Sequence, residues 1–163
     1  MKWNEIPQSG IKTERMHKEH KAMLIGEYFH NLDTKGRVSI PSKFRDDLGG
    51  TFVLSKGVND CLCAYSKEEW EAFQQELLEL KGADARKLRR FFFAGATECE
   101  IDAQGRVVIP PAYREYANLG KEVVIVGVSN CMEIWNKDEW EAYMNDPSLD
   151  SEEIEGAMER LGL

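Results

Sequence analysis

DTKGRVSIP, residues 33–41, returns as DAQGRVVIP at residues 102–110. In both copies an Asp opens a short polar stretch, a Gly follows three positions later, an Arg comes next, and an apolar run ends in Pro. A Gly at that point supplies the positive φ of a tight turn, and the Asp side chain can accept hydrogen bonds from nearby backbone N–H groups. The pattern predicts two hairpin tips, each with a basic residue beside it; residues 33–37 are the first tip and residues 102–106 the second tip.

The similarity between the two halves of the chain extends well beyond these nine residues. After a small insertion it continues through the following strands into a helix. The further aligned pairs are Phe44 and Tyr113, Arg45 and Arg114, Cys61 and Cys131, Tyr65 and Trp135, Lys67 and Lys137, and Trp70 and Trp140. Self-similarity over this length indicates the tandem duplication of one small module.

The same order of elements is predicted in both modules. A strand leads into the tip, a short alternating strand leaves it, a helical segment follows the Pro, and two more strands precede a closing helix. The expected strands are 26–32, 38–40, 52–54 and one ending at Tyr65 in the first half, and 97–101, 107–109, 123–128 and one ending at Trp135 in the second. Gly49 and Gly120 are expected to end the helical segments that follow Pro41 and Pro110.

The closing helices have recognisable start signals. Ser66 followed by Glu69 is a capping box, and Asn136 followed by Glu139 is its variant. A further helix, from about 84 to 93, is expected to join the two modules. An apolar stripe on the first closing helix, formed by Trp70, Phe73 and Leu77, is expected to face the core rather than a ligand.

The size of each module limits its fold. A module of about 50 residues is too small to close a good core by itself, although the whole chain of 163 residues, 42% of them hydrophobic, can do so. The two modules must therefore pack on each other or intertwine. Closure into a shared barrel would remove exposed strand edges. The predicted class is α+β, mainly β, with flanking helices.

Charge is unevenly distributed along the chain. The net charge of −8 argues on its face against a nucleic-acid partner. Basic residues nevertheless cluster, and much of the acidity lies after residue 137. The two basic groups are Lys35, Arg37, Lys43 and Arg45, and Arg86, Lys87, Arg89 and Arg90. A locally positive face on an acidic protein and ordinary solvated charges are both open interpretations.

Several function classes find little support in the sequence. The chain shows neither a membrane span nor a secretory leader, so a soluble cytosolic protein is expected. Cys61, Cys63, Cys99 and Cys131 lack the spacing of a zinc site, and reduced thiols packed as small hydrophobes are favoured. His17 and His20, in HKEH, are a nominal metal pair in a polar segment. No catalytic constellation is found, and no enzyme activity, cofactor, metal or small-molecule substrate is predicted.

Two longer stretches carry a family resemblance. MLIGEYFHNLDTKGRVSIPSKFR, residues 23–45, and IDAQGRVVIPPAYREYA, residues 101–117, resemble the MraZ family of bacterial transcriptional regulators, whose hallmark is the duplicated Asp-x-x-x-Arg element. The resemblance implies tandem swapped-hairpin modules of the AbrB-like (SpoVT-AbrB) type that form one pseudo-two-fold β-barrel. It further implies a cytoplasmic, nucleoid-associated homo-oligomer, a ring of about eight or more subunits.

The resemblance also implies a partner and a role. The partner is double-stranded DNA with closely spaced direct repeats upstream of the protein's own gene, and the role is repression of the division and cell-wall gene cluster. A protein-interaction or antidote-type module without specific DNA binding is the alternative, since AbrB-like barrels are also used in that way.

The resemblance also implies roles for the polar residues of the two tips. Lys35, Arg37 and Arg106 match the basic positions of the family motif and are expected to contact DNA, with Gln104 as a neutral contact in place of the first tip's lysine. The expected turn-bracing residues are Asp33, Gly36, Asp102 and Gly105. The alternative for Arg37 and Arg106 is that each braces its own turn through the neighbouring Asp, and one arginine can do both.

The expected domain organisation follows the repeat. Residues 1–22 are expected to be a disordered extension, and Met23 is an alternative start. Residues 23–80 form the first module, 81–96 a helical connector, 97–145 the second module, and 146–163 an acidic C-terminal helix or tail.

Overall fold

The computed structural model describes residues 23–163. The predicted N-terminal extension, with its HKEH stretch, lies outside the described residues. The first module contains β1 (Leu24–Asn31), β2 (Arg37–Ser39), α2 (Ser42–Leu48), β3 (Thr51–Lys56), β4 (Leu62–Ser66) and α3 (Lys67–Glu79).

The second module repeats this order of elements. Its elements are β5 (Ala96–Glu100), β6 (Arg106–Val108), α5 (Pro111–Tyr116), β7 (Glu122–Ser129), β8 (Met132–Asn136) and α6 (Lys137–Met144). Helix α4 (Ala83–Ala94) connects the modules, and η1 (Pro147–Leu149) and α7 (Ser151–Leu161) follow α6. No helix among residues 23–163 has the length and apolar composition needed to cross a bilayer.

The predicted helix starts are confirmed, but one predicted helix end is wrong. The Ser66 side chain accepts a hydrogen bond from Glu69 N at 3.1 Å, and Asn136 does the same for Glu139 N at 3.0 Å. Gly49 ends α2 with a φ of 78°. Helix α5 ends earlier than predicted: Ala117 is its C-cap, and Asn118 takes the left-handed conformation, so the helix ends before Gly120.

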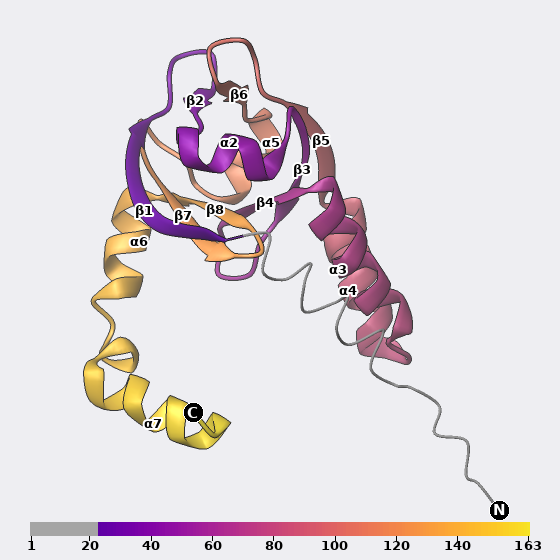
Figure 1. The fold of residues 1–163 in the computed structure, drawn as a ribbon, viewed down its shortest axis with the longest axis vertical. Helices are drawn as coiled ribbons and strands as arrows, with labels where there is room; N and C mark the ends of the chain where they lie inside the picture. The colour runs from indigo at the N-terminus through magenta and orange to yellow at the C-terminus, as the bar shows by residue number, and fades with distance from the viewer. Residues whose placement is uncertain (1–22) are drawn as a thin grey trace, which may run out of the picture.

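The modules exchange strands. β1 pairs along its whole length with β7 of the other module, and β5 pairs with β3. β4 and β8 pair in the middle, which gives one six-stranded antiparallel sheet in the order β1-β7-β8-β4-β3-β5. The short strands β2 and β6 pair only with each other. Within the modules only β3 pairs with β4 and β7 with β8, so neither module completes the sheet without the other (Figure 1).

Strand register reveals a pseudo-two-fold axis. Val38 pairs with Val107, its own equivalent in the repeat. In the central strand pair Cys63 lies opposite Glu133, and these two are also equivalent, because Cys61 aligns with Cys131. A residue that faces its own equivalent lies at a two-fold axis. The axis therefore passes through both the β2–β6 ribbon and the β4–β8 pair.

The sheet is not closed into the predicted barrel. β1 and β5 are its two edges, and the β2–β6 ribbon is a separate two-stranded sheet. Each edge strand runs into its tip and turns away from the sheet, and β2 and β6 are only three residues long. Because β2 and β6 pair only with each other, they do not bridge the two edge strands β1 and β5. The six-stranded sheet therefore stays open.

Two buried clusters cover the two faces of the sheet. One lies between the sheet, the ribbon and α2, and contains Phe44, Phe52, Ile40, Ile109 and Ile125, all 0–2% exposed. The other is aromatic and lies beneath α3 and α6. It includes Tyr65, Trp70, Trp135 and Trp140. Strand alternation produces this division, because Leu62 and Ala64 face the first cluster while Cys63 and Tyr65 face the second.

Strand exchange makes a prediction about the isolated first half. A chain of residues 23–95 lacks β5, β6, β7 and β8, so β1 and β2 lose their partners and β3 and β4 keep only each other. We expect it to be unfolded or to dimerise with a second copy that supplies the missing strands. Light scattering after gel filtration and circular dichroism distinguish the states. A monomer with cooperative unfolding would contradict the expectation.

Candidate nucleic-acid interface

The two tips lie side by side at one end of the molecule (Figure 1). Ile40 N donates to Gly105 O at 2.9 Å, and Ile109 N donates to Gly36 O at 2.8 Å. Each module thus holds the turn glycine of the other through its own backbone. Together with the β2–β6 pairing, these bonds fix the two tips relative to one another.

The first tip is braced by its aspartate. Gly36 has a φ of 77° and its N–H donates to Asp33 O at 3.0 Å. Asp33 Oδ1 accepts the backbone N–H groups of Lys35 and Arg37, both at 2.9 Å. Asp33 Oδ2 accepts Arg37 Nε at 2.7 Å. One carboxylate therefore holds both the turn and the direction of the arginine side chain.

The second tip repeats this arrangement. Asp102 Oδ1 accepts the backbone N–H groups of Gln104 and Arg106, both at 2.9 Å. Asp102 Oδ2 accepts Arg106 Nε at 3.2 Å. Gln104 adds a contact that the first tip lacks, because its Oε1 accepts a hydrogen bond from Arg106 Nη2. The glutamine thus contacts the neighbouring arginine within its own tip.

Both aspartates are held in the ionised form. The backbone N–H of Arg37 lowers the pKa of Asp33, and its guanidinium and the N–H of Lys35 add to the effect. The pKa of Asp102 is lowered in the same way, first by the backbone N–H of Arg106. Hydrogen bonds to the charged form of a carboxyl stabilise that form. At neutral pH each tip is therefore a fixed ion pair.

Two further arginines reach across to the opposite tips. The Arg45 guanidinium lies against Gly105, and Arg114 Cζ lies 2.9 Å from where a side chain on Gly36 would begin. Arg45 Nε donates to Ile40 O at 2.9 Å. Arg114 Nε is buried and has no hydrogen-bond partner within the described chain. These two crossed contacts are equivalent under the pseudo-two-fold axis.

The four arginines gather at one end of the molecule, where Asp33 and Asp102 are paired with two of them. The side chains of Arg37 and Arg106 are 27% and 30% exposed, so both reach solvent while their Nε atoms are held. Lys35 and Gln104 are exposed beside them. Guanidinium groups with fixed orientation are suited to bidentate contacts with phosphate or with the guanine edge. The arrangement can therefore bind a polyanion without a deep pocket.

Sequence reasoning missed part of this group. Arg45 was placed in the basic cluster around the first tip, but Arg114 was noted only as its aligned partner. The signal was present in the repeat: if Arg45 lies beside a tip, its equivalent does too. The crossing of each arginine to the other module's tip could not be read from spacing, because it depends on strand exchange.

The second basic run lies elsewhere. Arg86, Lys87, Arg89 and Arg90 are on α4, which packs beside α3 and projects away from the tips (Figure 1). Arg89 donates to the carbonyl oxygens of Leu77 and Leu80, near the end of α3. Lys87 lies 3.9 Å from Asp84. These contacts favour the interpretation of a helix face with structural and solvated charges.

Part of the acidity is also separated from the tips. Helix α7, which contains Glu152, Glu153, Glu155 and Glu159, lies at the opposite end of the molecule (Figure 1). The net charge of −8 therefore does not describe the tips. Local field, rather than total charge, governs whether a surface attracts an anion.

Comparison with known proteins points to one family in both a family model and individual relatives. The family model described as "MraZ protein, putative antitoxin-like" matches twice, at residues 23–91 and 92–160. A protein of Caldicellulosiruptor saccharolyticus named "Transcriptional regulator MraZ" is 54% identical over 86% of this chain and 100% of its own length. Relatives with the same name in Alkaliphilus oremlandii and Alkaliphilus metalliredigens are 51% and 50% identical with the same coverage.

The crossed arginine contact predicts the effect of a glycine substitution. Gly105→Ala places a Cβ where the Arg45 guanidinium lies, at a φ of 76° that side chains disfavour. We expect a loss of about 1–3 kcal/mol in the free energy of unfolding. Gly120→Ala is the control, since Gly120 has no neighbour within 4 Å of the added atom and no left-handed φ. Urea unfolding measures both; equal stabilities for the two variants would contradict the contact.

Proposed function

The chain belongs to the MraZ family, and from this premise we propose that it is a DNA-binding transcriptional regulator that contacts DNA with its paired tips. The observation that carries the proposal is the cluster of four arginines at the end where the tips meet. Two of these arginines are held by carboxylates and two cross between modules. The names of the relatives support the same function.

The contacts of Arg37 and Arg106 suggest how they would bind. Asp33 and Asp102 occupy the Nε atoms, which leaves the outer N–H groups of Arg37 free to point toward DNA. An arginine oriented in this way can grip a phosphate or pair with guanine O6 and N7. The aspartates act as positioning residues, because a carboxylate facing DNA directly would repel phosphate. Lys35, exposed at the first tip, would add a phosphate contact.

Gln104 makes the two tips different. It replaces the lysine of the first tip and contacts Arg106. The second tip is therefore less basic and more constrained. We propose that it contributes a neutral contact to a base edge or to the DNA backbone, so the two tips would read unlike parts of one site.

The functional unit spans both modules. We propose that the modules 23–80 and 97–145, with the connector 81–96, form one AbrB-like swapped-hairpin unit in the cytoplasm and nucleoid, and that 146–163 is an acidic tail. Strand exchange supports this unit, since neither module completes its own sheet. The presentation of both tips depends on the β2–β6 pairing between modules.

We further propose that the protein acts as a homo-oligomeric ring on direct repeats upstream of its own gene, and represses the division and cell-wall gene cluster. A single protomer offers few cations and would bind weakly. Several protomers on consecutive repeats would raise avidity by roughly 10²–10⁴ without new contacts. Exposed apolar side chains support assembly: Ile25 and Phe29 on the edge strand β1 are 64% and 56% exposed.

A second candidate function is a protein-interaction module. The family description contains the word antitoxin-like, and antidote-type proteins bind a protein partner. In that case the arginines of the tips would be dispensable for function, and the exposed helices would be essential. The tip substitutions below separate the two candidates.

Tip substitutions test the DNA contact directly. We expect Arg37→Ala or Arg106→Ala to weaken binding to upstream DNA roughly tenfold or more, because each removes an oriented guanidinium. The oligomer mass, measured by light scattering, should not change. Arg160→Ala, on α7, is the matched control. Full affinity in both tip variants would refute the proposed contact, whereas a changed mass would show that the tips act in assembly.

Repeat number tests the multivalent mode. DNA with three direct repeats should bind at least about 100-fold more tightly than DNA of equal length with one, because the later contacts are intramolecular. Binding should also weaken steeply with salt, since each neutralised phosphate releases counterions. Fluorescence anisotropy at two salt concentrations measures both effects. Equal affinities for the two DNAs would contradict the proposal.

A further inference from the structure

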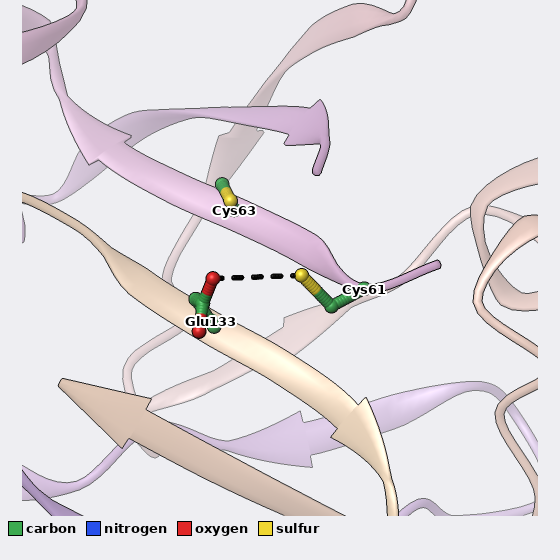
Figure 2. A group of neighbouring side chains, drawn as sticks. All are labelled: Cys61, Cys63 and Glu133. Atoms are coloured by element: carbon green, nitrogen blue, oxygen red, sulfur yellow. Dashed lines mark hydrogen bonds between the residues drawn. The ribbon is translucent and has the colours of Figure 1, made fainter. Parts of the chain in front are cut away.

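A group of thiols and a carboxylate gathers at the centre of the sheet. Cys61 immediately precedes β4 and Cys63 lies within it, while Glu133 is on the neighbouring strand β8 (Figure 2). One ligand atom from each of the three lies within 4.8 Å of the others. Cys61 and Cys63 are buried, and Glu133 is half-buried.

The spacing of these atoms fits a tetrahedral metal ion. Cys61 Sγ lies 3.6 Å from Glu133 Oε2. A zinc ion about 2.3 Å from a sulfur and about 2.1 Å from an oxygen, with a tetrahedral angle between them, separates the two ligand atoms by about 3.6 Å. The observed distance between Cys61 Sγ and Glu133 Oε2 therefore equals the separation expected for two atoms bound to one zinc ion.

The pseudo-two-fold axis points to a candidate for the fourth ligand. The axis passes between Cys63 and Glu133, and it exchanges Cys61 with Cys131. The contact between Cys61 and Glu133 therefore has its counterpart between Cys131 and Cys63. The neighbouring thiols of Cys131 and Cys61, together with burial, raise the pKa of Cys63. Cys131 thus borders the group at Cys63, while only Cys61, Cys63 and Glu133 have ligand atoms that all lie within 4.8 Å of one another.

Neighbouring residues fix the members of the group. Gly57 lies beneath the two first-module sulfurs: a Cβ there would come within 2.8 Å of both Cys61 Sγ and Cys63 Sγ. Glu133 Oε1 accepts the indole N–H of Trp135 at 3.2 Å, which orients the carboxylate. No lysine or arginine of residues 23–163 forms an ion pair with Glu133. A half-buried carboxylate without a cation gains most from a bound cation.

We propose that Cys61, Cys63 and Glu133, joined by Cys131 as the fourth ligand, bind one thiophilic divalent cation, Zn²⁺, at the interface between the two modules. Thiolates favour such ions over Mg²⁺ or Ca²⁺, and binding releases the thiol protons to solvent. The ion would join β4 to β8 and so stabilise the pairing of the modules. This site is separate from the tips and does not depend on the proposed function.

Such a site is not apparent from the sequence. The ligands come as Cys-x-Cys in one module and Cys-x-Glu in the other, about 70 residues apart, and neither pair has the spacing of a zinc motif. Sequence analysis therefore predicted no metal. Only the antiparallel β4–β8 register brings the two pairs together.

Cobalt binding to the full chain tests the site. The purified protein, treated with chelator and kept reduced, is titrated with Co²⁺, a spectroscopic probe for Zn²⁺ sites. We expect one equivalent per chain, thiolate-to-cobalt charge-transfer absorption, the visible bands of a tetrahedral ion, and displacement by Zn²⁺. A spectrum without thiolate absorption would overturn the proposal.

Variants identify the ligands. The double change Cys61→Ser and Cys63→Ser should abolish the thiolate absorption, and Cys131→Ser and Glu133→Gln should each weaken binding about tenfold or more. Cys99→Ser is the matched control, because Cys99 is buried but lies in the other cluster. Equal loss in the Cys99 variant would overturn the assignment. Unchanged affinity in the Cys131 variant would remove Cys131 from the set.

A measurement on the unmodified protein covers the case in which buried variants misfold. X-ray absorption of the zinc-loaded wild-type chain should show sulfur neighbours at about 2.3 Å. A shell of nitrogen and oxygen alone, at about 2.0 Å, would mean surface binding and would overturn the site.

Discussion

The pairing of β2 with β6 across the pseudo-two-fold axis is the interaction on which the rest of the structure depends. It places Val38 opposite Val107 and brings the two tips together. The same exchange gives β1 to the second module and β5 to the first. Because each module supplies strands that the other needs, the sheet, the core and the arginine cluster form together. The repeat therefore allows a single chain to form one pseudo-symmetric unit.

Electrostatics at the tips follows from that pairing. Asp33 and Asp102 hold both the turn and the arginine, so the charged groups are oriented before any partner arrives. Arg45 and Arg114 cross to the opposite tips. Preorganised cations lose less conformational entropy on binding than flexible ones. An acidic protein can in this way gather basic side chains at one end, with much of its acidity on helices distant from that end.

Local features were predictable from the sequence, and non-local ones were not. The caps at Ser66 and Asn136 and the turn at Gly36 depend on residues within three or four positions, so composition and spacing were enough. The positions of the two tips were predicted from the repeat, and their role from the family resemblance. The open sheet, the crossing of Arg114 and the gathering of Cys131 with Cys63 depend on strand register between modules, which periodicity does not encode. Gly120 does not end α5, because Asn118, two residues earlier, already takes the left-handed conformation.

The measurement that tests the central claim most directly is a gel-shift titration of the full chain with the DNA upstream of its own gene, beside a scrambled DNA of equal length, at low and high salt. The account predicts tighter binding to the upstream DNA and a loss of affinity for both DNAs as salt rises. Absence of binding by a folded, homogeneous protein would contradict it, and would move the function of the chain to recognition of a protein partner.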